Sequence, residues 1–364
     1  MPKEISFSLN MTNTRVNEID LLRFLAALAV VFFHYAFRGY AADAMSVMPY
    51  PSLASISKYG YLGVQLFFMI SGFVILMTAA NGSLRDFIIS RLVRLYPAFW
   101  ACCTITSLLI VAIGAPNFKV SLSQYLINMT MLSEYIGVPS IDGVYWSLFV
   151  EMKFYVLVCL ILLVGRIHQV QGILILWLIA SIITLPIHSY RLTYYLIADY
   201  SAFFIAGATF FLIWSKGFSL ARFWIIALSW GLAVYQSIAD LPNFEKNYHV
   251  TMNRSLVIGV VTIFFVTMMC VSLRKTGAFG RSRWVIVGAI TYPLYLLHQN
   301  IGFMIFNTIY PKINANLLFW GTIFLMLVTA YAVHILIEKR LASSMKITID
   351  RFFCGAGWKK AVIR

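Results

Sequence analysis

The stretch VYWSLFVEMKFYVLVCLILLVG, residues 144–165, decides the fold class of this chain. As an α-helix rising about 1.5 Å per residue it is about 33 Å long, and the hydrocarbon core of a bilayer is about 30 Å thick. Glu151 and Lys153 are its charged residues. The stretch therefore predicts a helix that spans a membrane.

Nine further stretches on either side have a similar length and apolar character. They cover residues 19–38, 59–79, 96–114, 171–188, 195–215, 218–238, 255–273, 286–306 and 317–337. Residues 122–137 are partly apolar but contain Gln124, Asn128 and Glu134, so we expect a loop or an interfacial segment there. The sequence predicts an all-α polytopic membrane protein with about ten transmembrane helices.

The composition agrees with this prediction. Of 364 residues, 61% are apolar and 11% are charged, whereas soluble domains have about 45–50% apolar and about 25% charged residues. These values exclude a soluble enzyme, a disordered chain and a disulfide-rich secreted module. The five cysteines form no C-x-x-C pair. We interpret them as packing residues and expect no metal site.

Basic residues are distributed unevenly between the loops. The chain has 28 Lys and Arg against 13 Asp and Glu, a net charge of +15. With the N-terminus in the cytoplasm, 19 basic residues lie on the cytoplasmic side and 7 on the outer side, when Arg222 and Arg38, near the ends of their spans, are counted with the adjoining loops. Because cytoplasmic loops are enriched in Lys and Arg, we expect both termini in the cytoplasm. The excess charge then reflects topology beside membrane lipids, and nucleic acid is not an expected partner.

The predicted spans follow one another without a linker or an obvious internal repeat. We therefore expect one membrane domain, residues 19–337. A cytoplasmic N-terminal tail, residues 1–18, precedes it, and a cytoplasmic C-terminal tail, residues 338–364, follows it.

The first predicted span carries three ionisable residues, Asp20, Arg23 and His34. At 100° per residue, Asp20 and His34 lie within about 40° of each other on the helix, and about 21 Å apart along its axis. Ionisable groups inside a membrane are costly and are functional candidates by default. The alternative is an interfacial Asp20–Arg23 pair and a histidine packed against a neighbouring helix.

Residues 144–165 carry a second polar group. Ser147, Glu151 and Tyr155 are spaced i, i+4, i+8 and share one helix face. Lys153 points elsewhere, so Glu151 needs a partner from another span. A structural salt bridge is the alternative to a functional role.

Three other predicted spans, the ninth, the tenth and the second, also carry polar residues. Tyr295, His298 and Gln299 share a face of the ninth predicted span, where His298 is either functional or a satisfied core histidine. We interpret His334, in the tenth span, as a core residue. Ser71, next to Gly72, provides a small polar spot that permits close helix packing.

Arg91 and Arg94 lie at the inner end of the third predicted span, spaced i, i+3. Two neighbouring guanidinium groups suit a phosphate, because each can form bidentate hydrogen bonds. The alternative is a pair of anchors that reach the lipid headgroups. Together these groups fit a phosphorylated donor that enters from the cytoplasm, with proton transfer deeper in the membrane.

In this order the motifs resemble the acyltransferase 3 family of bacterial integral-membrane O-acyltransferases. They are Asp20…Arg23…His34, Phe67-Phe68…Ser71-Gly72-Phe73, Arg91-x-x-Arg94…Tyr96-Pro97, Trp146-Ser147-Leu148…Glu151…Phe154-Tyr155 and Tyr292-Pro293-Leu294-Tyr295…His298. The resemblance implies an acetyl-CoA donor, a catalytic role for His34 and CoA binding by Arg91 and Arg94. It also implies a glycan acceptor of the cell envelope or an exported polysaccharide, and a place in the bacterial inner membrane.

We therefore expect transfer of an acetyl group to a glycan hydroxyl, with His34 as general base or as an acetylated intermediate. Glu151 would orient the His34 ring or stabilise its imidazolium form, and Tyr295, His298 or Ser147 would donate to the oxyanion. Arg23 would join the donor site, and Asp20, Ser71 and Tyr155 would support it. The competing functions are a proton-coupled transporter or flippase, and a membrane scaffold without chemistry.

Overall fold

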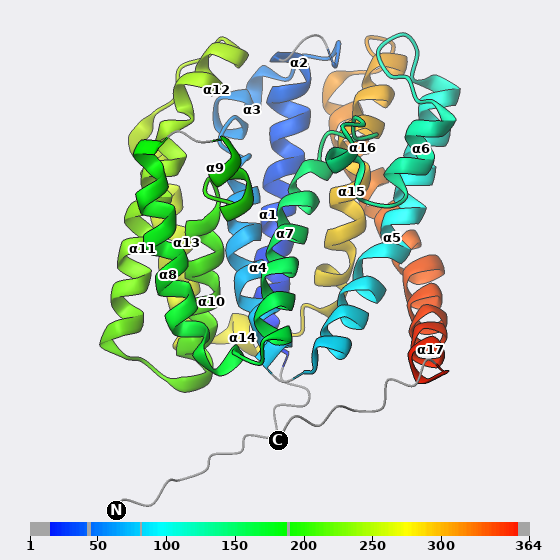
Figure 1. Cartoon of the computed structure of the whole chain (residues 1–364). Coiled ribbons are helices and arrows are strands. Elements are labelled where there is room, and N and C mark those ends of the chain that lie inside the picture. The colour runs from blue at the N-terminus through cyan, green and yellow to red at the C-terminus, as the bar shows by residue number, and fades with distance from the viewer. Residues whose placement is uncertain (1–14, 42–44, 81, 188–189, 356–364) are drawn as a thin grey trace, which may run out of the picture.

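The structure, a computed structural model, describes residues 15–41, 45–80, 82–187 and 190–355. These residues form helices and connecting loops, and the long helices stand side by side in one bundle (Figure 1). Among the described residues, nine helical segments are long and apolar enough to span a membrane. Their main helices are α1 (Asn17–Phe32), α4 (Leu62–Ala80), α5 (Leu84–Ile113), α7 (Tyr145–Leu163), α8 (Val170–Thr184), α10 (Ser201–Lys216), α11 (Leu220–Ala239), α13 (Arg254–Ser272) and α16 (Ala315–Val333).

The remaining predicted span is α15 (Val285–Ile309), a helix of 25 residues that stands within the bundle (Figure 1). It is not one of the nine apolar segments, because its polar residues, His298, Gln299 and Asn300 among them, lower its hydropathy. These three residues are buried inside the protein rather than exposed to lipid. Counted with α15, the helices confirm the prediction of a polytopic membrane protein with about ten spans.

Short elements connect the long helices. They are η1 (Phe33–Arg38), α2 (Gly39–Ala41), α3 (Pro51–Ser57), α6 (Leu122–Asn128), η2 (Ser133–Ile136), η3 (Ile167–Gln169), η4 (Leu185–Ile187), α9 (Tyr190–Leu196), α12 (Leu241–Tyr248), α14 (Ala278–Arg281) and η5 (His334–Glu338). The segment 122–137 holds only α6 and η2, which are too short to span a membrane, as predicted. After α16 the helix continues through η5 into α17 (Lys339–Gly355).

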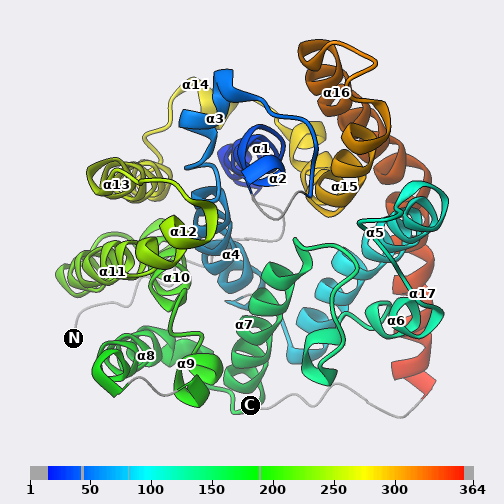
Figure 2. The ribbon, with the colours of Figure 1, turned by 90° about the horizontal axis from the view of Figure 1, so that it is seen from above.

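The core of the bundle is formed by α1, α4, α10 and α15. Viewed from above, α1 and α4 lie between the helices α8, α10, α11 and α13 on one side and α5, α15 and α16 on the other (Figure 2). Helix α4 packs closely on α10. The close approach requires Gly72 and Gly207, because a Cβ at either position would collide with the backbone of the facing helix. The small spot at Ser71 and Gly72 thus has the packing role that its composition indicates.

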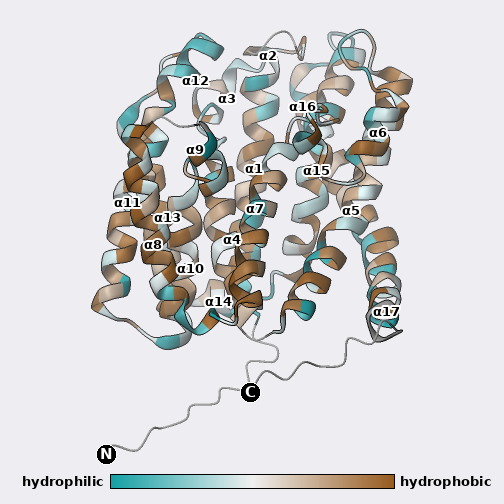
Figure 3. Cartoon of the chain, in the orientation of Figure 1, coloured by the Kyte–Doolittle hydropathy of each residue, from teal (hydrophilic) through white to brown (hydrophobic). Residues whose placement is uncertain are grey.

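The outer faces of the bundle are apolar, and its two ends are more polar (Figure 3). Large side chains such as Leu108 and Val111 of α5 point away from the protein, with 65% and 76% of their surface exposed. Exposed apolar faces of this kind suit contact with lipid. The start of α1 and the end of α17 lie at the same end of the bundle (Figure 1), which agrees with an even number of spans.

Candidate functional site

The bundle contains two large cavities that meet in its interior. One has a volume of about 720 Å³ and opens at the end that holds α12; the other has a volume of about 530 Å³ and opens at the end that holds α14. We call them the outer and the inner cavity, after the expected orientation. Val64 and Tyr295 line both cavities. The two cavities are therefore neighbours, separated by these two side chains.

The inner cavity is basic. Among the described residues that line it, five are basic and two are acidic: Arg15, Arg23, Arg91, Arg94 and Lys339, with Asp20 and Glu151. The motif arginines Arg91 and Arg94 thus share one cavity, as their spacing indicates. Such a lining attracts an anionic ligand, and guanidinium groups bind phosphate well.

Hydrogen bonds orient several of these groups. The Arg91 guanidinium donates to Thr78 Oγ1 at 3.2 Å and to Ser90 Oγ at 3.1 Å. Arg94 Nη1 lies 3.7 Å from Glu338 Oε1. Asp20 Oδ2 accepts a hydrogen bond of 2.6 Å from Arg15 Nε, so Asp20 pairs with Arg15 rather than with Arg23 as the alternative interpretation supposed.

The polar face of α7 points into the inner cavity. Ser147, Glu151 and Tyr155 all line it, as the i, i+4, i+8 spacing predicts. Glu151 Oε1 accepts a hydrogen bond of 2.6 Å from Ser71 Oγ of α4. The predicted partner from another span is therefore a serine of the inner cavity. This contact corrects the expectation that Glu151 orients the His34 ring, because His34 lines the outer cavity.

Two buried histidines meet at the outer cavity. His34 Nδ1 lies 2.9 Å from His298 Nε2 and 2.9 Å from the Val30 carbonyl oxygen. His298 Nδ1 lies 2.8 Å from the Tyr295 carbonyl oxygen. The two side chains are 6% and 0% exposed. His298, rather than Glu151, is thus the group that positions the His34 ring.

These contacts assign the tautomers of two neutral rings. Since a carbonyl oxygen only accepts, His298 carries its proton on Nδ1, and its Nε2 is an acceptor. His34 Nδ1 then donates, to Val30 and to His298 Nε2. The remaining nitrogen, His34 Nε2, keeps its lone pair. A lone pair on this nitrogen is what a general base requires.

The backbone around His34 departs from a regular α-helix. Residues Phe33–Arg38 form η1, a π-helix that continues α1. π-Helical segments are rare and often occur at functional sites. Both His34 and Arg38 of this segment line the outer cavity. Arg38 Nη1 donates to Gln299 Oε1 at 3.0 Å, which ties η1 to α15.

The contacts between α7 and α15 include a hydroxyl pair at the junction of the cavities. Ser147 Oγ and Tyr295 Oη are 2.7 Å apart, and Tyr295 lines both cavities. These two hydroxyls, predicted as oxyanion donors, are therefore placed between the two sites. His298 is not such a donor, because its Nδ1–H is bonded to the Tyr295 carbonyl oxygen and its Nε2 accepts from His34.

Asp142 is a residue that the sequence analysis missed. It lies in the loop before α7 and is 0% exposed. Its Oδ2 accepts from the Asn300 backbone N–H at 3.0 Å and its Oδ1 from the Val144 N–H at 3.2 Å. Burial raises the pKa of Asp142 to about 7. A single loop aspartate carries no sequence signal that reveals such contacts.

Further residues at the inner cavity were also missed. His334, which we interpreted as a core residue, lines this cavity, and its Nδ1 lies 2.8 Å from Glu338 Oε2. Arg15 and Lys339 line it as well, although they lie in the predicted tails. In the described part of the chain, no group of three or more His, Cys, Asp and Glu side chains could hold a metal ion.

Comparisons with known proteins identify relatives of this chain. A family model described as an acyltransferase domain, acyltransferase 3, matches residues 16–338. The "Putative acetyltransferase ORF330" of Acidianus two-tailed virus is 23% identical over 291 residues, which are 77% of this chain and 81% of that protein. "Nodulation protein 10" of Rhizobium leguminosarum bv. viciae is 27% identical over 180 residues, 44% and 47% of the two chains. No solved structure matches.

Proposed function

The chain belongs to the acyltransferase 3 family and is a multi-pass membrane acyltransferase, and we propose that it transfers an acetyl group from acetyl-CoA to a hydroxyl of a glycan. The observation that carries this proposal is the meeting of a basic cavity with a cavity that holds a histidine base. The acceptor is an envelope or exported polysaccharide, and the protein acts in a bacterial inner membrane.

The inner cavity would hold the donor. The phosphate groups of CoA are anionic, so Arg91 and Arg94, with Arg23, would bind them. The pantetheine arm would then extend toward Tyr295, where the cavities meet. This arrangement brings the thioester to the acceptor without moving the CoA phosphates out of the basic cavity.

The chemistry would take place beside His34. Its Nε2 removes the proton of the acceptor hydroxyl as the oxygen attacks the thioester carbonyl carbon. Ser147 and Tyr295 donate hydrogen bonds to the oxyanion. When the tetrahedral intermediate collapses, the carbon–sulfur bond breaks and the His34 imidazolium returns the proton to the departing thiolate. The products are the acetyl ester and CoA.

The first prediction concerns His34. Purified His34→Ala protein, supplied with labelled acetyl-CoA and glycan, should transfer acetyl groups at least about 100-fold more slowly, as loss of a general base requires. Acetyl-CoA binding should be unchanged, since His34 lies outside the inner cavity. Full transfer by the variant would contradict the base assignment. Glycan flux in vesicles without consumption of acetyl-CoA would support a transporter instead.

The second prediction concerns the donor site. Replacing both Arg91 and Arg94 with alanine should weaken CoA binding, measured by calorimetry, at least about tenfold, because two charge-assisted contacts are lost. The affinity for the glycan should change little. Arg166→Ala is the matched control, because Arg166 is an exposed arginine that does not line either cavity. Equal CoA affinity in the double variant and the control would refute the assignment.

A further inference from the structure

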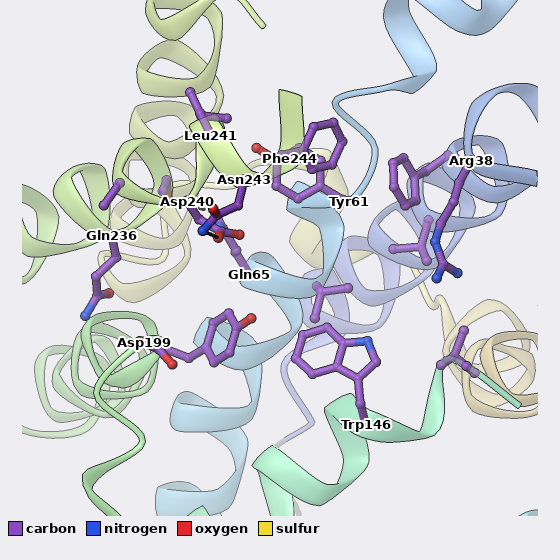
Figure 4. A pocket seen from close by; sticks show the side chains of 18 of the residues that line it. Arg38, Tyr61, Gln65, Trp146, Asp199, Gln236, Asp240, Leu241, Asn243 and Phe244 are labelled. Atoms are coloured by element: carbon purple, nitrogen blue, oxygen red, sulfur yellow. Dashed lines mark hydrogen bonds between the residues drawn. The ribbon is translucent and has the colours of Figure 1, made fainter. Parts of the chain in front are cut away.

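The outer cavity has an acidic and aromatic wall, unlike the inner one. Asp199 lies just before α10, and Asp240 lies between α11 and α12; both line the cavity. Figure 4 shows Asp199, Gln236 and Asp240 on one side of the cavity and Arg38 on the other. Trp146 lies between them (Figure 4). The wall thus combines carboxylates, amides and a flat apolar ring.

The carboxylates are not neutralised within the cavity. Among its described lining residues, Arg38 is the one with a cationic side chain, and it bonds to Gln299 Oε1 and to Tyr248 Oη, each at 3.0 Å. Lys153 interacts electrostatically with Asp199 from outside the cavity, and its ammonium group lies 3.2 Å from the centre of the Tyr194 ring. Asp240 Oδ1 accepts a long hydrogen bond of 3.4 Å from Asn243.

The wall also contains polar atoms that the described chain leaves unpaired. Tyr61 Oη and Gln236 Oε1 are buried and have no hydrogen-bond partner among the described residues. Gln65, 8% exposed, also faces this cavity from α4. Both unpaired atoms are enclosed by the protein, so a ligand in this cavity meets Asp199, Asp240, Gln65 and Trp146 rather than these two atoms.

We propose that this wall binds one sugar ring of the acceptor, a ring without a carboxylate or phosphate group, and that Asp199 and Asp240 exclude acidic sugars. This inference rests on the proposed function, since it assigns the acceptor of the same site. Hydroxyl or amide N–H groups of a sugar can donate to both carboxylates, and Trp146 offers an apolar face for the ring. An acidic sugar would place a like charge beside two carboxylates, which disfavours its binding.

The test measures binding without acetyl-CoA. Purified protein in nanodiscs is applied to immobilised trisaccharides of two kinds, neutral (glucose, galactose and N-acetylglucosamine) and acidic (glucuronate, galacturonate and sialate). We expect the wild type to bind at least one neutral trisaccharide at least tenfold more tightly than any acidic one. The Asp199→Asn, Asp240→Asn double variant should lose most of this discrimination, mainly by binding the acidic sugars more tightly.

The control is Glu134→Gln, which removes an acidic charge from an outer loop that does not line this cavity. It should keep the discrimination of the wild type. CoA binding at the inner cavity verifies that each variant is folded. Equal binding of neutral and acidic sugars by the wild type, no binding of either, or unchanged discrimination in the double variant would overturn the inference. Selective binding of neutral sugars without any acetyl transfer would instead leave the inference intact and refute the proposed function.

Discussion

At the scale of single residues, the site is formed by side chains that are distant in the sequence. His34 and His298 are 264 positions apart, yet their ring nitrogens are 2.9 Å apart. The sequence singled out both histidines, because polar residues inside apolar spans are rare and costly. It could not pair them. The sequence did not predict a special role for Asp142, because aspartates are common in loops and only its burial distinguishes it.

A pH-dependent stability is predicted for Asp142. Its pKa of about 7 in the folded protein exceeds its ordinary value of 3.8, so the folded state holds a proton that the unfolded state has released. Stability should therefore decrease as the pH rises from about 4 through 7. Thermal unfolding in detergent at pH 5 and pH 8 measures the decrease. In Asp142→Asn it should be smaller than in the wild type, and an equal decrease in both proteins would contradict the assignment.

At the scale of elements, glycines and polar faces decide how the helices pack. The spacing of Ser147, Glu151 and Tyr155 correctly predicted one common face of α7. The same argument did not say that this face meets Ser71 of α4, because helical periodicity describes one helix at a time. At Gly72 of α4 and Gly207 of α10 the two helices approach closely, because neither glycine has a side chain.

The contact of α4 with α10 gives a prediction for stability. Gly72→Leu should destabilise the protein by at least about 1–3 kcal/mol, because a side chain there collides with the α10 backbone. Thermal unfolding in detergent measures the change. Gly231→Leu is the matched control, since a Cβ at Gly231 of α11 meets nothing within 4 Å. Similar melting temperatures for the two variants would show that the close approach is not needed.

At the scale of the whole molecule, two cavities of different charge open at opposite ends of one bundle. The basic cavity lies at the end with the start of α1 and with α17, and the distribution of Lys and Arg predicts that this end faces the cytoplasm. The acidic and aromatic cavity lies at the other end. A donor and an acceptor can then approach from opposite sides of the membrane.

This orientation is tested by labelling. In a variant whose native cysteines are replaced, Lys119→Cys should react with a membrane-impermeant maleimide in intact cells, because Lys119 is an exposed residue of the loop between α5 and α6. Lys346→Cys in α17 should react only after permeabilisation. The reverse pattern would place the basic cavity outside the cell, where acetyl-CoA is absent, and would contradict the proposed donor.

The fold class, the approximate spans and many of the polar residues that line the cavities can be predicted from the sequence alone. Span length and hydropathy are local properties, so they can be read without knowing what each helix contacts. The hydrogen-bond partners follow from the packing of the helices: Arg15 for Asp20, Ser71 for Glu151 and His298 for His34. These pairings depend on how each helix is rotated and packed against helices from distant parts of the chain. In a membrane this packing rests on side-chain shape and hydrogen bonds, which a hydropathy pattern does not encode.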